Sequence, residues 1–213
     1  MTTDATALAA LAALVDTWVD GFAVSRSVPV RRSGGLTEVQ VAAESRRVEL
    51  VVVEPDEALL AKVVDRIVGT TDVWSTVITV ERHRFEIPAQ IDVRLDGEVI
   101  MEAALLESPS GDDRVDLAPD GPRAFATITM EGVQAAQGQV ALVDGTAVFD
   151  RIGTHEDYRR RGLAGAVMRA LTRWAVAQGA HRGLLAASVE GQPLYAGLGW
   201  RPVAAMVTLA GRG

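Results

Sequence analysis

The residues whose types and spacing best suit chemistry lie between Ile152 and Gly165, in the run Ile-Gly-Thr-His-Glu-Asp-Tyr-Arg-Arg-Arg-Gly-Leu-Ala-Gly. This run is predicted to leave a strand, pass through an Arg- and Gly-rich turn and enter a helix. Backbone N–H groups at a helix start have no partners within the helix, and the helix dipole makes that end positive. Gly162 and Ala164 let an anion approach closely, and Arg159, Arg160 and Arg161 add cations beside it. The segment therefore predicts a binding site for a pyrophosphate group.

Two motifs in this region resemble those of a known family. The first segment lacks the Gly-Lys-Ser/Thr of a Walker A loop. It is similar instead to the signature of the GCN5-related N-acetyltransferases (GNAT), Arg/Gln-x-x-Gly-x-Gly/Ala, which appears as Arg159-x-x-Gly162-x-Ala164. A second segment, from Ser188 to Trp200, resembles the family's Asn-x(6)-Tyr-x-x-x-Gly-Phe block, with Tyr195 at the tyrosine position. The resemblance covers residues 86–213.

The resemblance implies acetyl-CoA as cosubstrate and no metal. The pantetheine arm would pair with a strand end that splays from the strand ending near Ser188, as when a peptide adds to a sheet edge. The pyrophosphate would rest on N–H groups at the helix start. The implied cosubstrate-binding residues are Ile152, Gly153, Thr154, Arg159, Arg160, Arg161, Gly162, Leu163, Ala164, Gly165 and Ser188.

The implied reaction is direct transfer of an acetyl group to a primary amine of a small molecule or a protein. Tyr195 would protonate the departing thiolate as general acid. An amine is protonated at neutral pH and must lose a proton before it attacks. Asp150, Glu156 or a chain of waters could accept that proton, and Asp150 joins Tyr195 as a candidate catalytic residue. The sequence does not choose among these bases.

The chain departs from the family pattern in several places. Ser188 stands where asparagine is common, Glu156 where proline often occurs and Trp200 where phenylalanine is usual. The stretch between the first strand of residues 86–213 and Ala124 reads as strand and loop, without the helix pair that usually lines the acceptor pocket in the family. The acceptor therefore stays open. An alternative function is a non-enzymatic acyl-CoA-binding module that kept the phosphate cradle and lost turnover.

Composition excludes several other function classes. The chain has 213 residues and no cysteine, which excludes disulfides, thiolate metal sites and cysteine nucleophiles. Its three histidines, His83, His155 and His181, are far apart in sequence, so no metal site is expected. A net charge of −7 argues against nucleic-acid binding, for which a basic protein is typical.

The fold class expected from the resemblance is α/β (α+β), with a mixed, mostly antiparallel sheet flanked by helices. Residues 86–213 are predicted to form the acetyltransferase domain, and residues 1–85 an N-terminal region that is a degenerate copy of the same fold. In the N-terminal region, residues 28–35 read as a loop, residues 39–41, 48–53 and 72–80 as strands, and residues 55–67 as a helix.

The predicted elements of residues 86–213 follow from turn signals and periodicity. Residues 90–106 read as a hairpin around Asp96-Gly97, and residues 108–122 as a long surface loop. Strands are predicted over residues 124–131, 137–144, 146–154, 183–188 and 201–209, and helices over residues 162–178 and 192–198.

The N-terminal helix carries the expectations about location. Leu8, Leu11, Leu14, Trp18 and Phe22 recur at helical spacing and predict an amphipathic helix. A signal peptide needs a basic residue near its start, but no basic residue precedes Arg26. Asp16 and Asp20 also interrupt the apolar run, which is therefore too short to span a membrane. We therefore expect a cytoplasmic protein that does not associate with membranes. Its oligomeric state stays open, with a homodimer as one candidate.

Overall fold

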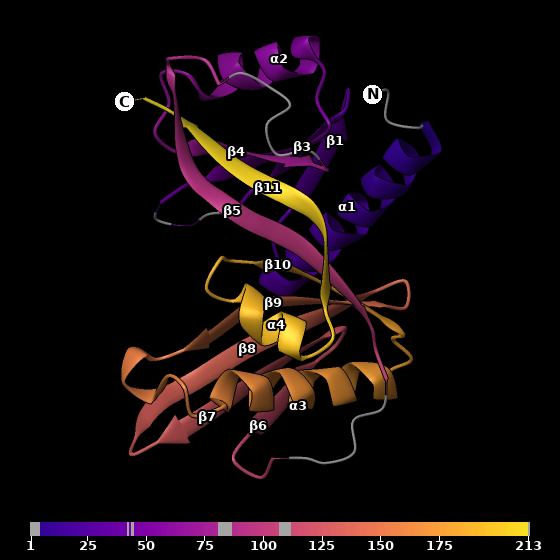
Figure 1. The fold of residues 1–213 in the computed structure, drawn as a ribbon, viewed down its shortest axis with the longest axis vertical. Helices are drawn as coiled ribbons and strands as arrows, with labels where there is room; N and C mark the ends of the chain where they lie inside the picture. Colours follow the sequence, from indigo (N-terminus) through magenta and orange to yellow (C-terminus); the bar gives the residue numbers. More distant parts are fainter. Residues whose placement is uncertain (1–4, 42, 44, 81–86, 107–111, 213) are drawn as a thin grey trace.

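The computed structural model describes residues 5–41, 43, 45–80, 87–106 and 112–212. The N-terminal region contains two helices and four strands (Figure 1). In chain order they are α1 (Ala5–Arg26), β1 (Val30–Ser33), β2 (Leu36–Val39), β3 (Val48–Val53), α2 (Glu57–Ile67) and β4 (Val73–Thr79). Asp56 caps α2 by accepting a hydrogen bond from the N–H of Leu59, at 2.7 Å.

The remainder of the chain contains seven strands, two α-helices and a short 3-10 helix. These are β5 (Ile91–Ala104), β6 (Asp116–Asp120), β7 (Arg123–Met130), β8 (Val133–Val143), β9 (Thr146–Thr154), η1 (Glu156–Tyr158), α3 (Leu163–Ala177), β10 (Arg182–Ala187), α4 (Gln192–Gly197) and β11 (Arg201–Gly211). The helices predicted over residues 162–178 and 192–198 and the strands predicted over residues 124–131, 137–144 and 146–154 are confirmed, with shifts of a few residues at their ends.

All the strands belong to one 11-stranded mixed sheet, in the order β1-β2-β3-β4-β11-β5-β10-β9-β8-β7-β6. Only two neighbouring pairs are parallel, β3 with β4 and β9 with β10. A helix connects each parallel pair, α2 the first and α3 the second, as parallel strands require. The C-terminal strand β11 lies between β4 and β5, so it joins the sheet of the N-terminal region to that of the remaining chain.

Helices α1 and α3 cover opposite faces of the sheet at β9 and β10. Because side chains alternate along a strand, Val148 and Leu184 pack in the core beside α1, whereas Phe149 and Leu185 pack in the core beside α3. Figure 1 shows α3 and α4 in front of these strands and α1 behind them. A third core lies beneath α2, around Leu50 and Leu209.

Three sequence predictions about loops and turns are wrong. Residues 90–106 do not form a hairpin, because β5 runs straight through Asp96-Gly97 and pairs with β11 over its length, with Gly97 at φ 93° in a local bulge. Residues 116–120 of the predicted loop form strand β6. Because β6 lies at the edge of the sheet, Pro119, which has no backbone N–H, does not remove a hydrogen bond from the interior of the sheet. The loop predicted over residues 28–35 contains strand β1 instead, because residues 30–33 pair with residues 36–39 in a hairpin around Gly34-Gly35. Residues 107–111 lie outside the described residues.

Helix α1 is long and apolar enough to cross a membrane by length and composition alone. The core helix of a soluble protein passes the same test. One side of α1, which includes Leu11, Trp18 and Phe22, is buried in the core that it shares with the sheet. Arg32 binds the carboxylates of Asp16 and Asp20 at the surface of the helix. The predictions of no membrane association, of cytoplasmic location and of a homodimer stay predictions.

Gly21 allows α1 to cross β9 at close range. A Cβ atom at Gly21 would lie 2.2 Å from Cγ2 of Val148, which is too close for two carbon atoms that are not bonded to each other. We therefore expect Gly21→Ala to destabilise the protein by about 1–3 kcal/mol, the usual cost of overpacking a core. Urea unfolding followed by circular dichroism measures this change.

Two further variants control this prediction. Gly197→Ala, where an added Cβ meets nothing within 4 Å, should leave the unfolding midpoint unchanged or raise it slightly. The double variant Gly21→Ala/Val148→Ala removes the methyl groups that clash and should recover part of the loss. An unchanged midpoint in Gly21→Ala alone would show that α1 does not cross β9 at this distance.

Candidate active site

Strands β9 and β10 pair for only four residues and then separate. Their parallel register runs from Thr146 opposite Arg182 to Phe149 opposite Leu185. Beyond this point β9 continues to Thr154 paired with β8 alone, and β10 continues to Ala187 paired with β5 alone. The edge of β9 that faces β10 therefore carries backbone groups without ladder partners, as the sequence predicted for Ile152, Gly153 and Thr154.

A β-bulge bends β9 where the two strands separate. Asp150 pairs with Gln139 and Gly153 pairs with Gln137, so Arg151 and Ile152 together oppose one residue of β8. Arg151 adopts a left-handed backbone conformation with φ 53°. Such bulges increase local twist and redirect a strand. The bulge thus turns residues 151–154 away from the line of β10.

The N-terminus of α3 follows this strand end and has no side-chain cap. Gly162 is the N-cap residue with φ 74°, and a Cβ added there would meet nothing within 4 Å. Arg160 also has a positive φ, 59°. Arg161 lies 5.0 Å from the centre of the Tyr158 ring and donates to the carbonyl of Asp157. The helix start is thus open to solvent at Gly162, next to the exposed side chains of Arg159, Arg160 and Arg161.

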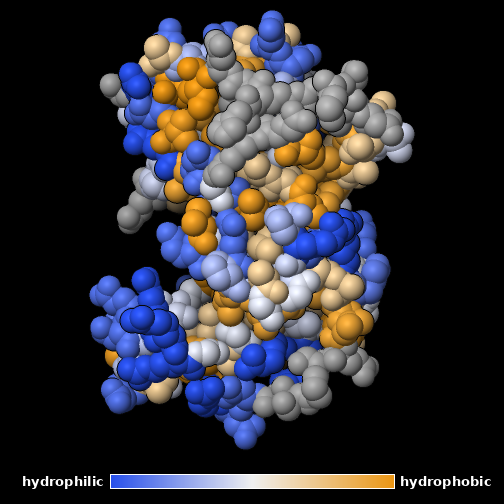
Figure 2. All heavy atoms as spheres, viewed as in Figure 1, coloured by the Kyte–Doolittle hydropathy of each residue, from blue (hydrophilic) through white to orange (hydrophobic). Residues whose placement is uncertain are grey.

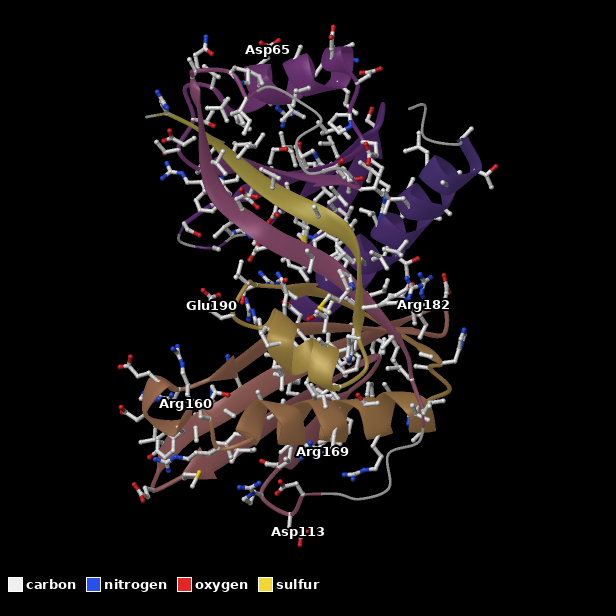
Figure 3. The ribbon with its side chains drawn as sticks, viewed as in Figure 1. Asp65, Asp113, Arg160, Arg169, Arg182 and Glu190 are labelled. Carbon is white, nitrogen blue, oxygen red and sulfur yellow. The ribbon has the colours of Figure 1, made fainter. Side chains whose placement is uncertain are left out.

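The predicted anion site lies on one side of the molecule, next to a recess. In Figure 3, Arg160 lies at the N-terminal end of α3, and Glu190, in the loop after β10, lies above it on the same side. Figure 2 shows hydrophilic side chains gathered around the Arg160 loop and an outline that recedes between this loop and the upper part of the molecule. At the start of α3, Gly162 is exposed and Ala164 is partly exposed, whereas Leu163 and Gly165 are buried.

Ser188 holds the turn between β10 and α4. Its Oγ accepts a hydrogen bond from the N–H of Gly191 at 3.2 Å, and its carbonyl accepts from the N–H groups of Gly191 and Gln192. Gln192 in turn donates to the carbonyl of Gly97 on β5, at 2.7 Å. These contacts fix the start of α4, the helix that carries Tyr195.

Tyr195 is 7% exposed and lies at the wall of a cavity of about 290 Å³. Its ring centre is 6.3 Å from that of Trp200. Burial, with a smaller contribution from the negative charge of Asp150, raises the pKa of Tyr195 to about 12. The phenol is therefore fully protonated at neutral pH. Asp150, Ile152 and Ser188 line the same cavity, so the fold brings these four predicted residues together.

Asp150 connects α1 to β9 through a dense set of hydrogen bonds. Nε and Nη2 of Arg26 donate to its two oxygens at 2.7 and 2.8 Å. Three further donors are the hydroxyl of Ser25, the side-chain amide of Gln139 and the backbone N–H of Arg151. The carboxylate oxygens are thus already occupied by donors, which favours a structural role. The prediction that Asp150 takes the proton of the amine stays a prediction.

The cavity also contains polar residues of the N-terminal region that sequence reasoning missed. Glu49 on β3 is buried, and Arg46 donates to its Oε2 at 2.9 Å. The hydroxyl of Thr76 on β4 donates to Oε1 of Glu49 at 2.6 Å and lies 3.1 Å from the hydroxyl of Thr208 on β11. A glutamate within the apolar run 48–53 was the one sequence signal for this network, because charged residues are rarely buried without a partner.

Glu98 on β5 is another missed residue of the cavity. Partial burial and the nearby charge of Glu49 raise the pKa of its carboxyl group above the ordinary value of 4.5, with Arg46 opposing and Glu190 adding to the effect. Within the described part of the chain, no hydrogen bond or ion pair engages the Glu98 carboxylate. Across the same residues no three His, Cys, Asp or Glu side chains group as metal ligands. His83 lies outside them.

Comparisons with known proteins give the family. A family model described as "Acetyltransferase (GNAT) family" matches residues 98–200. No curated protein sequence matches the chain.

Several solved structures share the fold. A GCN5-related N-acetyltransferase from Kribbella flavida is 18% identical, with 95% of each chain covered and a TM-score of 0.65. A protein of the GNAT family from Novosphingobium aromaticivorans is 17% identical, with 86% of this chain and 92% of that chain covered and a TM-score of 0.63. A tandem GNAT protein from the clavulanic acid biosynthesis pathway is 15% identical, with 86% and 82% covered and a TM-score of 0.51. Residues 98–200 therefore match the GNAT acetyltransferase family, and the chain has the fold of these GNAT structures along most of its length.

Proposed function

We propose that the protein is an acetyl-CoA-dependent N-acetyltransferase that transfers an acetyl group directly to a primary amine. The observation that carries this proposal is the early end of the β9/β10 pairing, which leaves a strand edge between two other features. On one side is the uncapped N-terminus of α3, and on the other is the buried phenol of Tyr195. Anion binding, strand pairing and proton donation can thus be served by one continuous region.

The residues present fit acetyl-CoA. The first-turn N–H groups of α3, with Arg159 and Arg160 beside them, suit a pyrophosphate, because oriented N–H groups and cations both stabilise its charge. The free backbone groups of residues 152–154 suit the two amides of the pantetheine arm, in the manner of an added strand. Gly153 leaves room for this approach, because a Cβ there would have no neighbour closer than 4.0 Å.

Tyr195 fits the role of general acid. During transfer a C–N bond forms and the C–S bond of the thioester breaks, so the sulfur leaves as a thiolate that needs a proton. The Tyr195 phenol keeps its proton at neutral pH because its pKa is raised to about 12. A non-enzymatic acyl-CoA-binding module would use the same cradle but would not need this phenol.

The first test concerns the anion site. Gly162→Glu places a carboxylate where the pyrophosphate should lie, and like charges about 4 Å apart near a surface repel by several kcal/mol. We expect the affinity for acetyl-CoA, measured by calorimetric titration, to fall at least ~100-fold. Gly179→Glu is the matched control, because Gly179 lies just beyond the other end of α3 with a similar positive φ of 90° and open space around it. Equal affinity in folded Gly162→Glu and wild type would refute the site.

The second test concerns Tyr195. Tyr195→Phe keeps the ring and removes the proton, so we expect kcat for CoA thiol release with a panel of primary amines to fall by roughly 10²–10⁴. The affinity for acetyl-CoA should stay within a factor of about three. If wild type binds acetyl-CoA and no amine stimulates thiol release, the alternative of a non-enzymatic binding module is favoured.

The pH dependence provides a third test. Because the pKa of Tyr195 is raised to about 12, its phenol loses its proton only at pH values well above neutral. We therefore expect kcat of the wild type not to fall between about pH 7 and pH 10. A loss of kcat in this range, in protein that circular dichroism shows to be folded, would mean that the general acid has a lower pKa than Tyr195.

A further inference from the structure

The N-terminal region and β11 supply part of the wall of the cavity beside Tyr195, and β5, β9, β10 and α4 supply most of the rest. Trp18, Phe22 and Arg26 come from α1, Glu49 from β3, Thr76 from β4 and Thr208 from β11. A volume of about 290 Å³ corresponds to about ten waters at ~30 Å³ each, or a molecule with about ten non-hydrogen atoms. The cavity is therefore of the size of a small metabolite.

This cavity meets the separated strands from the α1 side of the sheet. Val148, Met206 and Ile100 belong to the core on that side, while α3 and the N–H groups of its first turn lie on the opposite side. Asp150, Ile152 and Tyr195, at the point where β9 leaves β10, belong to the cavity wall. A molecule in the cavity would thus reach the strand separation from the side opposite to the anion site.

The charges of the cavity are paired unevenly. Arg26 is paired with Asp150, and Arg46 with Glu49, in contacts of 2.7 Å each. Of the remaining charged side chains in the wall, Arg151 is exposed to solvent and Glu98 is partly buried. Glu49 and Glu190 add negative charge near Glu98, and Arg46, the cation that acts on Glu98, already binds Glu49. A cation in the cavity would give the Glu98 carboxylate the partner that it lacks in the described residues.

We propose that this cavity is the acceptor site, that it takes a small primary amine as its ammonium ion, and that Glu98 receives the ammonium group and accepts its proton. This inference rests on the proposed function. Glu49 is held by Arg46 and Thr76, so it supplies negative potential while Glu98 supplies the free oxygens. The hydroxyls of Thr76 and Thr208 offer further polar contacts to the body of the amine.

The proton and bond changes balance. One proton of the ammonium ion passes to Glu98 and then to solvent. The neutral amine attacks the acetyl carbonyl, so that a C–N bond forms and, as the intermediate collapses, the C–S bond breaks. The sulfur takes a proton from Tyr195, and the phenol regains one from the nitrogen. One amide, one free thiol and one released proton result.

Two probes that differ only in one terminal group, an ammonium in one and a hydroxyl in the other, test the binding part. We would titrate 6-amino-1-hexanol and 1,6-hexanediol into the wild-type protein with desulfo-CoA present. A charged hydrogen bond contributes about 1.5–3 kcal/mol, so we expect the amine to bind ~10- to 100-fold more tightly than the diol. In Glu98→Gln this preference should shrink to within about threefold. Equal binding of both probes to wild type would overturn the proposal.

The kinetic part uses the same amine and thiol release. The pKa of the amine is near 10.4, so the fraction of free amine rises about tenfold per pH unit throughout the range from about pH 5 to pH 8. An enzyme that used only the free amine would therefore show kcat/KM rising without a plateau, whereas ionisation of an enzyme carboxyl group gives a rise that levels off within this range. The raised pKa of Glu98 predicts that kcat/KM increases with pH as this carboxyl group ionises. Glu98→Gln should lose this dependence and at least ~100-fold of kcat/KM, whereas Glu98→Asp should keep the dependence.

Glu190→Gln is the matched control, because Glu190 is exposed, lies outside the cavity wall and is the weakest of the charges acting on Glu98. It should leave kcat/KM within about twofold. A Glu98→Gln variant with wild-type kcat/KM and pH profile would overturn the role of Glu98. Failure of wild type to bind acetyl-CoA would instead refute the proposed function, whereas the preference for amine over diol, measured without CoA, would still test the cavity.

Discussion

The separation of β9 from β10 after Phe149 is the constraint on which the candidate site depends. Parallel strands satisfy one another's backbone groups only while they stay adjacent, and these two stop pairing after four residues. The groups that are released line the gap between the anion site and Tyr195. If β9 followed β10 to its end, the ladder would occupy the groups that the proposed cosubstrate needs.

Helix α1 stabilises this arrangement from the other face. The pair between Arg26 and Asp150 joins the end of α1 to β9 at the residue where the strands part, with side chains 18% and 12% exposed. Removing one partner of such a pair leaves the other charge poorly solvated, which is strongly destabilising. Gly21 brings the same helix close enough for this contact. Asp150 therefore matters for the site whether or not it ever takes a proton.

Strand β11 performs a comparable task for the proposed acceptor cavity. It inserts between β4 and β5, and so places Thr208 beside Thr76 and Glu49 on the neighbouring strands. It also replaces the hairpin that Asp96-Gly97 predicts, because a long partner strand supplies more ladder hydrogen bonds than a two-residue turn. The N-terminal region thus contributes part of the wall of the cavity beside Tyr195, in place of the helix pair that is missing from the described residues between β5 and β7.

The sequence by itself determined the local elements and the segment that we propose as the anion site. The Arg159-x-x-Gly162-x-Ala164 motif, the helix that follows it and the position of Tyr195 all depend on residues close together in the chain, where periodicity and turn chemistry act. Edge strands β1 and β6 were missed because their short, polar sequences fit a loop as well as a strand. Only the tertiary structure decided that Glu49, Glu98 and Thr208 share one cavity with Tyr195. Their meeting depends on the order of strands in the sheet, and strand order is set by packing between distant segments that no local pattern records.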